Sequence, residues 1–203
     1  MVTDPNPMTG NSDAQLLAAL GPRSLVLVGM MGAGKSSIGR KLAQRLNLPF
    51  VDADAEIELA AGRSISDIFA ERGEPYFRAG EARVIARLLE GGPQVLATGG
   101  GAFMHPKTRE AIRAKGISVW LKAEFDVLMK RIKRRSDRPM LKTDDPGTTL
   151  QRLMQERDPV YAEADIIVHS RDVPHEIIIA EIISAVMPRL EEIGALSAGA
   201  RMP

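Results

Sequence analysis

A glycine-rich segment between an apolar run and a helical pattern sets the strongest limit on the fold of this chain. Residues 24–28 are almost continuously apolar, and residues 29–36 match the pattern G-x-x-x-x-G-K-[ST] at every fixed position. Apolar residues then recur at Ile38, Leu42 and Leu46, which is a helical spacing. A short apolar run is typical of a strand buried on both faces. The order of strand, glycine loop and helix predicts a phosphate-binding loop in an α/β protein.

The residue types in this loop fit the chemistry of polyphosphate binding. A tight loop that points backbone N–H groups at phosphate needs positions without a Cβ atom, which Gly29, Gly32 and Gly34 provide. The following helix adds the positive end of its dipole, Lys35 would reach the β- and γ-phosphates, and Ser36 would bind Mg²⁺. The predicted nucleotide-binding residues are Gly32, Ala33, Gly34, Lys35, Ser36 and Ser37. A glycine-rich turn that binds nothing is the alternative, and the flanking strand and helix argue against it.

The composition is that of an ordinary soluble protein with a single domain. The 203 residues are 44% apolar and 26% charged, and the formal net charge is +1. A charge this small gives no support for nucleic acid or an anionic membrane as the main partner. The absence of cysteine excludes disulfides and thiolate metal sites and suits a reducing cytosol.

The first residues do not resemble a targeting sequence. They carry Asp4 and Asp13 and lack a basic start followed by an apolar run. No stretch reaches the roughly 18 consecutive apolar residues of a membrane span. We therefore expect a soluble, cytoplasmic protein in which residues 1–20 are an extension, disordered over about the first twelve residues and helical over 14–20.

Strand and helix patterns alternate through a domain that spans residues 21–193. Strands are predicted at 25–28, 50–54, 95–98, 117–121 and 166–168, and helices at about 35–46, 55–60, 62–90, 106–115, 125–135, 148–162 and 174–193. This alternation predicts an α/β fold of three layers, a parallel sheet with helices on both faces. The polar loop at about 136–147 has the composition of a mobile lid, and residues 194–203 form a C-terminal tail.

Two acids lie at the end of the second predicted strand and a run of glycines follows the third, so they face the same rim of the sheet as the phosphate loop. Asp52 and Asp54 are separated by one residue and would project to one side of an extended segment. One carboxylate could complete the Mg²⁺ shell and the other could address a substrate hydroxyl; alternatively, Asp54 caps the next helix. Residues 99–101, all glycine, would either let a ligand or another backbone approach closely or form a flexible turn.

Taken in order, the motifs resemble those of the shikimate kinase family, in the nucleoside-monophosphate-kinase-like group of P-loop proteins. They are Gly-Met-Met-Gly-Ala-Gly-Lys-Ser-Ser at 29–37, Phe-Val-Asp-Ala-Asp at 50–54, Phe-Arg at 77–78, Gly-Gly-Gly at 99–101, Arg-Pro-Met-Leu at 138–141 and Arg-Asp-Pro-Val-Tyr at 157–161. Each later motif is weak alone, whereas the ordered set is specific and spans about residues 24–185. The family often has leucine at Met140, a mild change. The resemblance implies a five-stranded parallel sheet and ATP-dependent phosphorylation of the 3-hydroxyl of shikimate in the chorismate pathway of aromatic amino-acid biosynthesis.

The resemblance also implies roles on the acceptor side of the site. Asp54 would bind and orient the accepting hydroxyl, with its deprotonation as a further option. Arg78 and Arg157 would hold the shikimate carboxylate, which suits guanidinium groups because they bind planar carboxylates in a bidentate fashion. Gly100 would contribute a backbone N–H.

On the nucleotide side, Asp52 would act on Mg²⁺ alongside Ser36, and Arg138 on the lid would close over the ATP phosphates. Phosphoryl transfer asks mainly for positioning and charge neutralisation, so the predicted catalytic residues are Lys35, Asp54 and Arg138. Arg171 corresponds to a late arginine that touches adenine in relatives. The choice between Arg134 and Arg135 as a second adenine contact stays open.

Three alternatives remain on the sequence alone. A gluconate-kinase-like enzyme would share the phosphate loop and an acid near the second strand, although Arg78, the three glycines and Arg157 favour shikimate. A nucleotide-dependent switch would carry an Asn-Lys-x-Asp segment, which this chain lacks. The basic run 130–135 is either an RNA-binding stripe or a solvated helix face, and the near-neutral charge and few aromatic residues favour the second. With no surface stripe that demands a partner, we expect a monomer.

Overall fold

The chain folds around one five-stranded parallel sheet. The computed structural model describes residues 7–133 and 145–199. The strands are β1 (Ser24–Val28), β2 (Phe50–Asp52), β3 (Val95–Ala97), β4 (Gly116–Lys122) and β5 (Ile166–His169), and they lie in the order β2-β3-β1-β4-β5. Every pairing is parallel. The predicted sheet is therefore confirmed.

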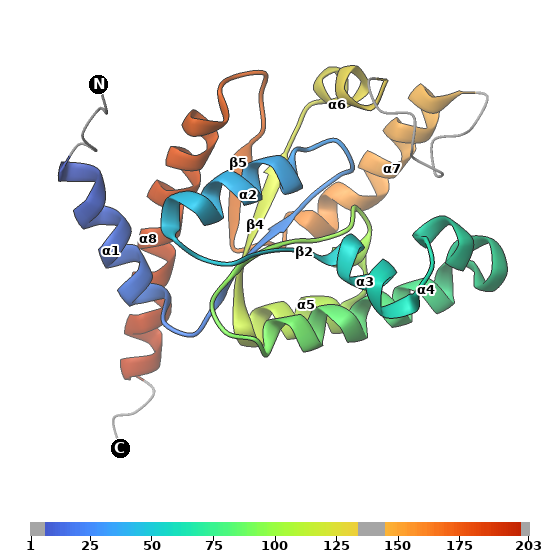
Figure 1. The fold of residues 1–203 in the computed structure, drawn as a ribbon. Coiled ribbons are helices and arrows are strands. Elements are labelled where there is room, and N and C mark those ends of the chain that lie inside the picture. Colours follow the sequence, from blue (N-terminus) through green and yellow to red (C-terminus); the bar gives the residue numbers. More distant parts are fainter. Residues whose placement is uncertain (1–6, 134–144, 200–203) are drawn as a thin grey trace, which may run out of the picture.

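Helices cover both faces of this sheet and give the three layers expected from the sequence (Figure 1). They are α1 (Pro7–Leu20), α2 (Lys35–Leu46), α3 (Ala53–Ala61), α4 (Ile65–Leu89), α5 (Pro106–Lys115), α6 (Phe125–Ile132), α7 (Pro146–Tyr161) and α8 (His175–Gly199), with a short 3₁₀ helix η1 (Ala102–Met104). α2 and α8 pack together on one face, and α4 and α5 on the other (Figure 1). Within the described ranges, no helix has the length and apolar character needed to cross a membrane.

The central strands are buried because their side chains are apolar on both faces. In β1, the side chains of Leu25, Val26, Leu27 and Val28 have no exposed surface. Burial of a side chain of this size contributes about 1.5–3 kcal/mol. β1 is therefore a firmly held base for the loop that follows it.

The boundary between β2 and α3 differs from the sequence prediction. β2 ends at Asp52 and α3 begins at Ala53, because the Asp52 carboxylate accepts the Asp54 N–H at 3.1 Å and caps the helix. The prediction that the strand extends through residue 54 is therefore wrong, and so is the alternative prediction that Asp54 caps the next helix. The cap places Asp54 in the first turn of α3.

The long helix α4 changes direction at one glycine. Gly73 has φ 75° and ψ 171°, which lies outside the helical region and is accessible at little cost only to glycine. The helix predicted over residues 62–90 is therefore interrupted at this position. At the start of α4, Ser64 accepts the Asp67 N–H at 3.1 Å and donates to its carboxylate at 2.7 Å, which caps the helix.

Most of the N-terminal extension is helical and packs on the domain. α1 begins at Pro7 rather than at residue 14, and it lies against α8 (Figure 1). The side chains of Leu16 and Leu20 are fully buried in this contact. The disorder predicted for residues 7–12 is therefore wrong, since α1 has a partner for its apolar side chains.

Parts of the predicted lid and tails fall outside the described ranges. These parts are residues 1–6, residues 134–144 with Arg134, Arg135 and Arg138, and residues 200–203. α7 begins at Pro146, so the end of the predicted lid belongs to a helix, which Asp145 caps by accepting the N–H groups of Gly147 and Thr148 at 3.0 Å. α8 continues to Gly199, beyond its predicted end.

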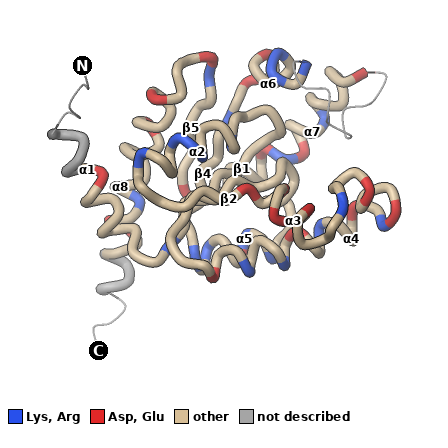
Figure 2. The backbone as a smooth tube through the Cα atoms, viewed as in Figure 1, with Lys and Arg blue, Asp and Glu red and all other residues tan. Residues whose placement is uncertain are grey.

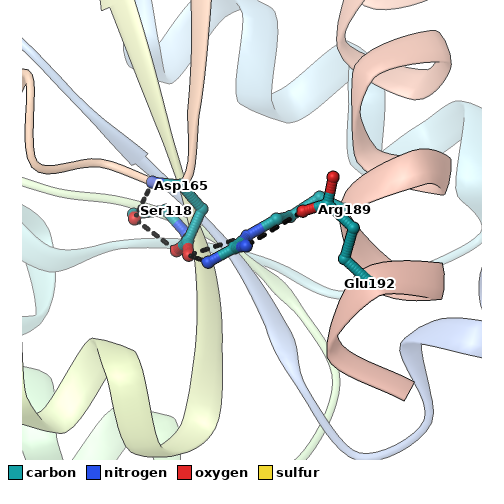
Figure 3. Close-up of polar contacts among 4 residues, drawn as sticks. All are labelled: Ser118, Asp165, Arg189 and Glu192. Atoms are coloured by element: carbon teal, nitrogen blue, oxygen red, sulfur yellow. Dashed lines mark hydrogen bonds and ion pairs between the residues drawn. The ribbon is translucent and has the colours of Figure 1, made fainter. Parts of the chain in front are cut away.

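A polar network ties the sheet to α8 (Figure 3). Asp165 precedes β5, and its carboxylate accepts the Ser118 N–H at 2.9 Å and the Ser118 hydroxyl at 2.6 Å. It also binds Arg189 of α8 at 2.9 Å, while Arg189 reaches the exposed Glu192 at 3.1 Å. Burial alone would raise the pKa of Asp165, but the Ser118 hydrogen bonds and Arg189 hold it below its ordinary value of 3.8.

We expect Asp165→Ala to lower the free energy of unfolding by about 2–3 kcal/mol near neutral pH, because Ser118 and Arg189 lose their shared acceptor. Because the folded-state pKa of Asp165 is lowered, its contribution is complete above the ordinary pKa of 3.8 and is lost as the pH falls through the folded-state value. Urea unfolding at a series of pH values measures both effects.

Glu192→Ala is the matched control for this substitution, because it removes only the exposed partner of Arg189. It should cost no more than about 0.5 kcal/mol. Equal decreases in the free energy of unfolding of the two variants would contradict the importance assigned to Asp165.

Candidate active site

A cavity of about 940 Å³ opens at the carboxyl ends of the strands, where open α/β sheets bind ligands. Its wall includes the loop after β1, the first turns of α2 and α3, parts of α4 and α7, residues 99–101 and the start of α8. The predicted residues in this wall are Gly32, Gly34, Lys35, Ser36, Ser37, Asp52, Asp54, Arg78, Gly100, Arg157 and Arg171. Segments far apart in the sequence therefore bring most of the predicted residues to one place.

The loop after β1 has the conformation that its glycines allow. Gly29, Gly32 and Gly34 have φ values of 130°, 83° and 96°, which other residues rarely adopt. A Cβ atom on Gly29 would lie 2.8 Å from the Leu121 carbonyl oxygen, so this position also needs glycine for space. α2 begins directly after Gly34, with the positive end of its dipole at the loop. The loop therefore has the geometry of an anion cradle.

Lys35 is the buried cation of this loop. Only 8% of the residue is exposed, and its Nζ donates to the carbonyl oxygens of Gly29 at 2.7 Å and Met30 at 2.9 Å. Beside it, the Ser36 hydroxyl donates to Asp52 Oδ2 at 2.7 Å. The two residues predicted to bind a metal ion thus lie in contact, next to the phosphate loop.

Asp54 lies in the first turn of α3 and faces the cavity. Asp54 is open to the cavity, but the cavity walls keep part of the surrounding water away from its carboxylate. This partial desolvation raises the pKa of Asp54 above the ordinary 3.8, with Lys35 opposing the rise. Its Oδ1 lies 2.7 Å from the position that a Cβ atom on Gly99 would take. A carboxylate with a raised pKa is a better proton acceptor than an ordinary one.

Arg78 is held by two acids of its own helix. Its Nη1 donates to Glu81 at 2.7 Å, and its Nε and Nη2 donate to Glu74 at 3.1 Å. Glu81 is 1% exposed, whereas the Glu74 side chain is 48% exposed. The rings of Phe69 and Phe77 lie 5.8 and 5.1 Å from the guanidinium carbon, and both rings belong to the cavity wall.

Glu81 is a site residue that the sequence analysis missed. Its Oε1 is buried, has no hydrogen-bond partner among the described residues, and lies 2.6 Å from where a Cβ atom on Gly99 would be. The available signal is its position three residues after Arg78, a spacing at which helical side chains meet. Helices contain many charged pairs at this spacing, and the sequence alone does not show that the pair of Arg78 and Glu81 is the buried one.

Each glycine of residues 99–101 is in close contact with a different part of the site. A Cβ atom on any of them would fall within 3.0 Å of a neighbouring atom. The neighbours are the Asp54 and Glu81 carboxylates for Gly99, the Met31 backbone for Gly100 and the Arg78 guanidinium for Gly101. These contacts favour the predicted close approach over a flexible turn.

Arg157 of α7 binds the middle of this glycine segment. It is 7% exposed, and its Nη1 donates to the Gly100 carbonyl oxygen at 3.0 Å. The Tyr161 hydroxyl donates to the same oxygen. The carbonyl of Gly100 therefore faces α7. Arg157 and Arg78 place two guanidinium groups in the wall of one cavity.

The cavity wall near α8 contains a second residue that sequence reasoning missed. Arg171 lies there as predicted and forms an ion pair with Glu181. Arg131 of α6, which the sequence grouped with a solvated basic run, also lies in the wall. Its guanidinium donates to the Ser170 hydroxyl at 2.8 Å and to the Arg171 carbonyl at 2.7 Å. Burial lowers the pKa of Arg131.

Two nucleotide contacts stay predictions. Ala33 is buried and is not part of the cavity wall, and its N–H donates to the Met30 carbonyl at 3.1 Å. Arg138 lies outside the described residues.

The basic run at 130–135 can be compared with the charges on the rest of the surface. Charges of both signs are mixed along α4 and α5 in Figure 2, and Lys130 of the basic run pairs with Asp172. Because Lys130 is paired and Arg131 lies in the cavity wall, the described part of the basic run does not form an open stripe of cations for RNA.

The fold and the cavity together define a P-loop phosphotransferase that acts on a small acceptor. One cavity contains a glycine loop with a buried lysine and, in addition, an acid and two arginines. Phosphoryl transfer needs this combination of charge neutralisation and positioning.

Comparison with known proteins gives the family. The shikimate kinase family model matches residues 31–187. The shikimate kinase of Bradyrhizobium diazoefficiens is 60% identical over 184 residues, covering 91% of this chain and 89% of that protein. The solved structure of shikimate kinase from Acinetobacter baumannii in complex with shikimate has a TM-score of 0.80 and 35% identity, over 87% of this chain and 97% of that chain. The chain belongs to the shikimate kinase family.

A gluconate-kinase-like enzyme, the closest alternative on sequence grounds, is supported only at the level of fold. The gluconokinase from Sinorhizobium meliloti has a TM-score of 0.58 and 22% identity, over 87% of this chain and 98% of that chain. This likeness gives no information about the acceptor, so the family assignment stands.

We expect Glu81→Gln to raise KM for the acceptor about tenfold and to leave KM for ATP within about twofold, because Arg78 loses its buried ionic partner. Glu74→Gln is the matched control, since Glu74 binds the same guanidinium from an exposed position, and it should change either constant by less than about twofold. Steady-state kinetics with each substrate varied in turn measures this difference. Equal effects of the two substitutions would argue against a special role for Glu81.

Proposed function

We propose that the chain transfers the γ-phosphoryl group of ATP to the 3-hydroxyl of shikimate, giving shikimate 3-phosphate for the synthesis of chorismate and the aromatic amino acids. One observation carries this proposal: a single cavity contains the phosphate loop with Lys35 and, in addition, Asp54, Arg78 and Arg157. Membership of the shikimate kinase family supports the acceptor. So does the likeness to a shikimate kinase solved in complex with shikimate.

The two arginines suit the carboxylate of shikimate. A guanidinium group binds a planar carboxylate through paired N–H donors. Arg78 is oriented by Glu81 and Arg157 by the Gly100 carbonyl before any ligand arrives. Because both side chains are already ordered, binding costs less conformational entropy.

Asp54 is proposed to act on the hydroxyl that attacks phosphorus. The bond from this oxygen to the γ-phosphorus forms as the bond to the ADP oxygen breaks, and the hydroxyl proton passes to the Asp54 carboxylate. The transition state of such transfers is loose, so orientation of the hydroxyl contributes more than early proton removal. The raised pKa of Asp54 suits the proton acceptor in this step.

Lys35 and the N–H groups of residues 32–37 are proposed to hold the β- and γ-phosphates of ATP. The buried ammonium group and the dipole of α2 favour the negative charge that these phosphates carry. We further propose that Arg138 neutralises charge on the transferring group and that Arg171 contacts the adenine. The position of Arg171 in the cavity wall supports its assignment.

Ser36 and Asp52 fit a magnesium ion. Their hydroxyl and carboxylate oxygens are hard ligands, lie 2.7 Å apart and adjoin the phosphate loop. Mg²⁺ in kinases usually takes one or two protein oxygens and completes its shell with phosphates and water. Bound there, the ion would neutralise charge on the β- and γ-phosphates.

We also propose that the enzyme works in the cytoplasm as a monomer, with ATP and shikimate as its partners and without nucleic acid or membrane. The absence of cysteine and the mixed surface charge support this setting.

ADP release from Mg·ATP tests the proposed function. Purified protein is assayed with shikimate, with gluconate and without an acceptor in matched reactions. Turnover that depends on shikimate is the expected result. Turnover with gluconate, or hydrolysis that needs no acceptor, would leave the phosphate site intact and overturn the acceptor assignment.

We expect Asp54→Asn to lower kcat for shikimate by about 100-fold or more, since the amide cannot accept the proton. ATP affinity should stay within about threefold, because the phosphate loop is unchanged. Isothermal titration with a non-hydrolysable ATP analogue serves as the control for folding and nucleotide binding. Near-normal turnover in this variant would remove Asp54 from the mechanism.

A further inference from the structure

Tyr161 is a fully buried residue beside the acceptor part of the cavity, and none of the roles above includes it. It is the last residue of α7, one turn after Arg157, and its hydroxyl donates to the Gly100 carbonyl. Arg157 Nη1 donates to the same oxygen at 3.0 Å. The Gly100 carbonyl oxygen thus accepts two hydrogen bonds from side chains of one helix, and these two bonds use both lone pairs of the oxygen.

These two hydrogen bonds restrain residues 99–101, a backbone segment with high intrinsic conformational freedom. Glycine loses more conformational freedom on folding than any other residue, and residues 99–101 are three glycines in succession. Fixing the Gly100 carbonyl also fixes the planar peptide group that joins Gly100 to Gly101. Gly99 lies against Asp54 and Gly101 against Arg78, so the orientation of this segment sets the space around both groups.

The ring of Tyr161 is itself held by aromatic contacts. Its centroid lies 5.6 Å from that of Trp120 in β4 and 6.3 Å from that of Phe103 in η1, both stacked. Trp120 in turn contacts the base of the phosphate loop, with Cδ1 3.1 Å from where a Cβ atom on Gly29 would be. Tyr161 therefore connects the glycine segment to the central sheet.

We propose that Tyr161 is a positioning residue for the acceptor: together with Arg157, it fixes residues 99–101 in the conformation that binds shikimate. This inference rests on the proposed function of the cavity. Tyr161 acts through Gly100 and contacts no substrate itself. Burial raises the pKa of its hydroxyl above the ordinary value of 10.0, so it stays a hydrogen-bond donor throughout the neutral range.

Tyr161→Phe tests this role, because it removes one hydroxyl and keeps the ring that packs on Trp120. KM for shikimate should rise about five- to tenfold, the size expected from one lost hydrogen bond, while KM for ATP stays within about twofold. Steady-state kinetics with each substrate varied gives both constants. Trp120 is the one tryptophan of the chain, so its fluorescence reports whether the ring stack persists.

Ser24→Ala is the matched control for the loss of a buried hydroxyl. Ser24 is also fully buried, and its hydroxyl donates to the Gly92 carbonyl at 3.0 Å at the start of β1, the end of the strand away from the phosphate loop. Both variants should lower Tm, whereas only Tyr161→Phe should raise KM for shikimate. An unchanged KM, or an equal rise for both substrates, would show that Tyr161 is only structural and would overturn the proposal.

A second pair of variants separates hydrogen bonding from packing. With p-fluorophenylalanine at position 161 the space of the hydroxyl is filled without a donor, whereas p-aminophenylalanine restores an N–H donor. The fluoro variant should behave like Tyr161→Phe, and the amino variant should return KM for shikimate toward the wild-type value. Equal KM values in the two variants would overturn the proposal, even if Tyr161→Phe itself failed to fold.

The wild-type chain distinguishes failure of this inference from failure of the proposed function. If the wild type neither binds nor phosphorylates shikimate, the proposed function is wrong and the positioning role falls with it. If the wild type phosphorylates shikimate and Tyr161→Phe keeps wild-type constants, only the positioning role is wrong.

Discussion

The acceptor side of the cavity depends on the missing Cβ atoms of residues 99–101. Two carboxylates reach Gly99, from α3 and from α4, and a guanidinium lies against Gly101. Charged groups this close to backbone are costly to bury unless opposite charges and hydrogen bonds compensate them. Glu81 has Arg78 for this purpose, and Lys35 favours the charged form of Asp54. A side chain at these positions would separate the groups that make up the site.

The order of the strands explains why motifs far apart in the sequence meet. β1 has β3 and β4 as neighbours, and β2 lies beyond β3. Because all strands are parallel, the phosphate loop, the acids after β2 and the glycines after β3 leave the sheet at the same rim. The apolar, fully buried β1 holds this rim in place. The fold therefore brings the phosphate loop, the two acids and the glycines together at one cavity.

Local signals in the sequence were sufficient for the parts of the site that short motifs define. The position of the phosphate loop, Asp54 and Arg78 at one cavity could be predicted, because each lies in a motif directly after a strand or within a helix. Glu81 lies in none of the motifs, and its place in the site comes from its burial beside Arg78. Tyr161 lies in the motif at 157–161, but only the fold shows that its hydroxyl meets the Gly100 carbonyl. The end of β2 was misjudged for a related reason: the Asp52 carboxylate binds a backbone N–H two residues later, and this local bond ends the strand.

The two halves of the cavity also touch through their backbones. A Cβ atom on Gly100 would lie 3.0 Å from the Met31 N atom, so residues 99–101 pack directly on the phosphate loop. In-line transfer requires reacting atoms about 3–3.5 Å apart, and small displacements reduce the rate strongly. Direct packing of backbone on backbone leaves less room for such displacement than contact through long side chains. In the proposed reaction, the alignment of nucleotide and acceptor would therefore depend largely on the same glycines that make the close approach possible.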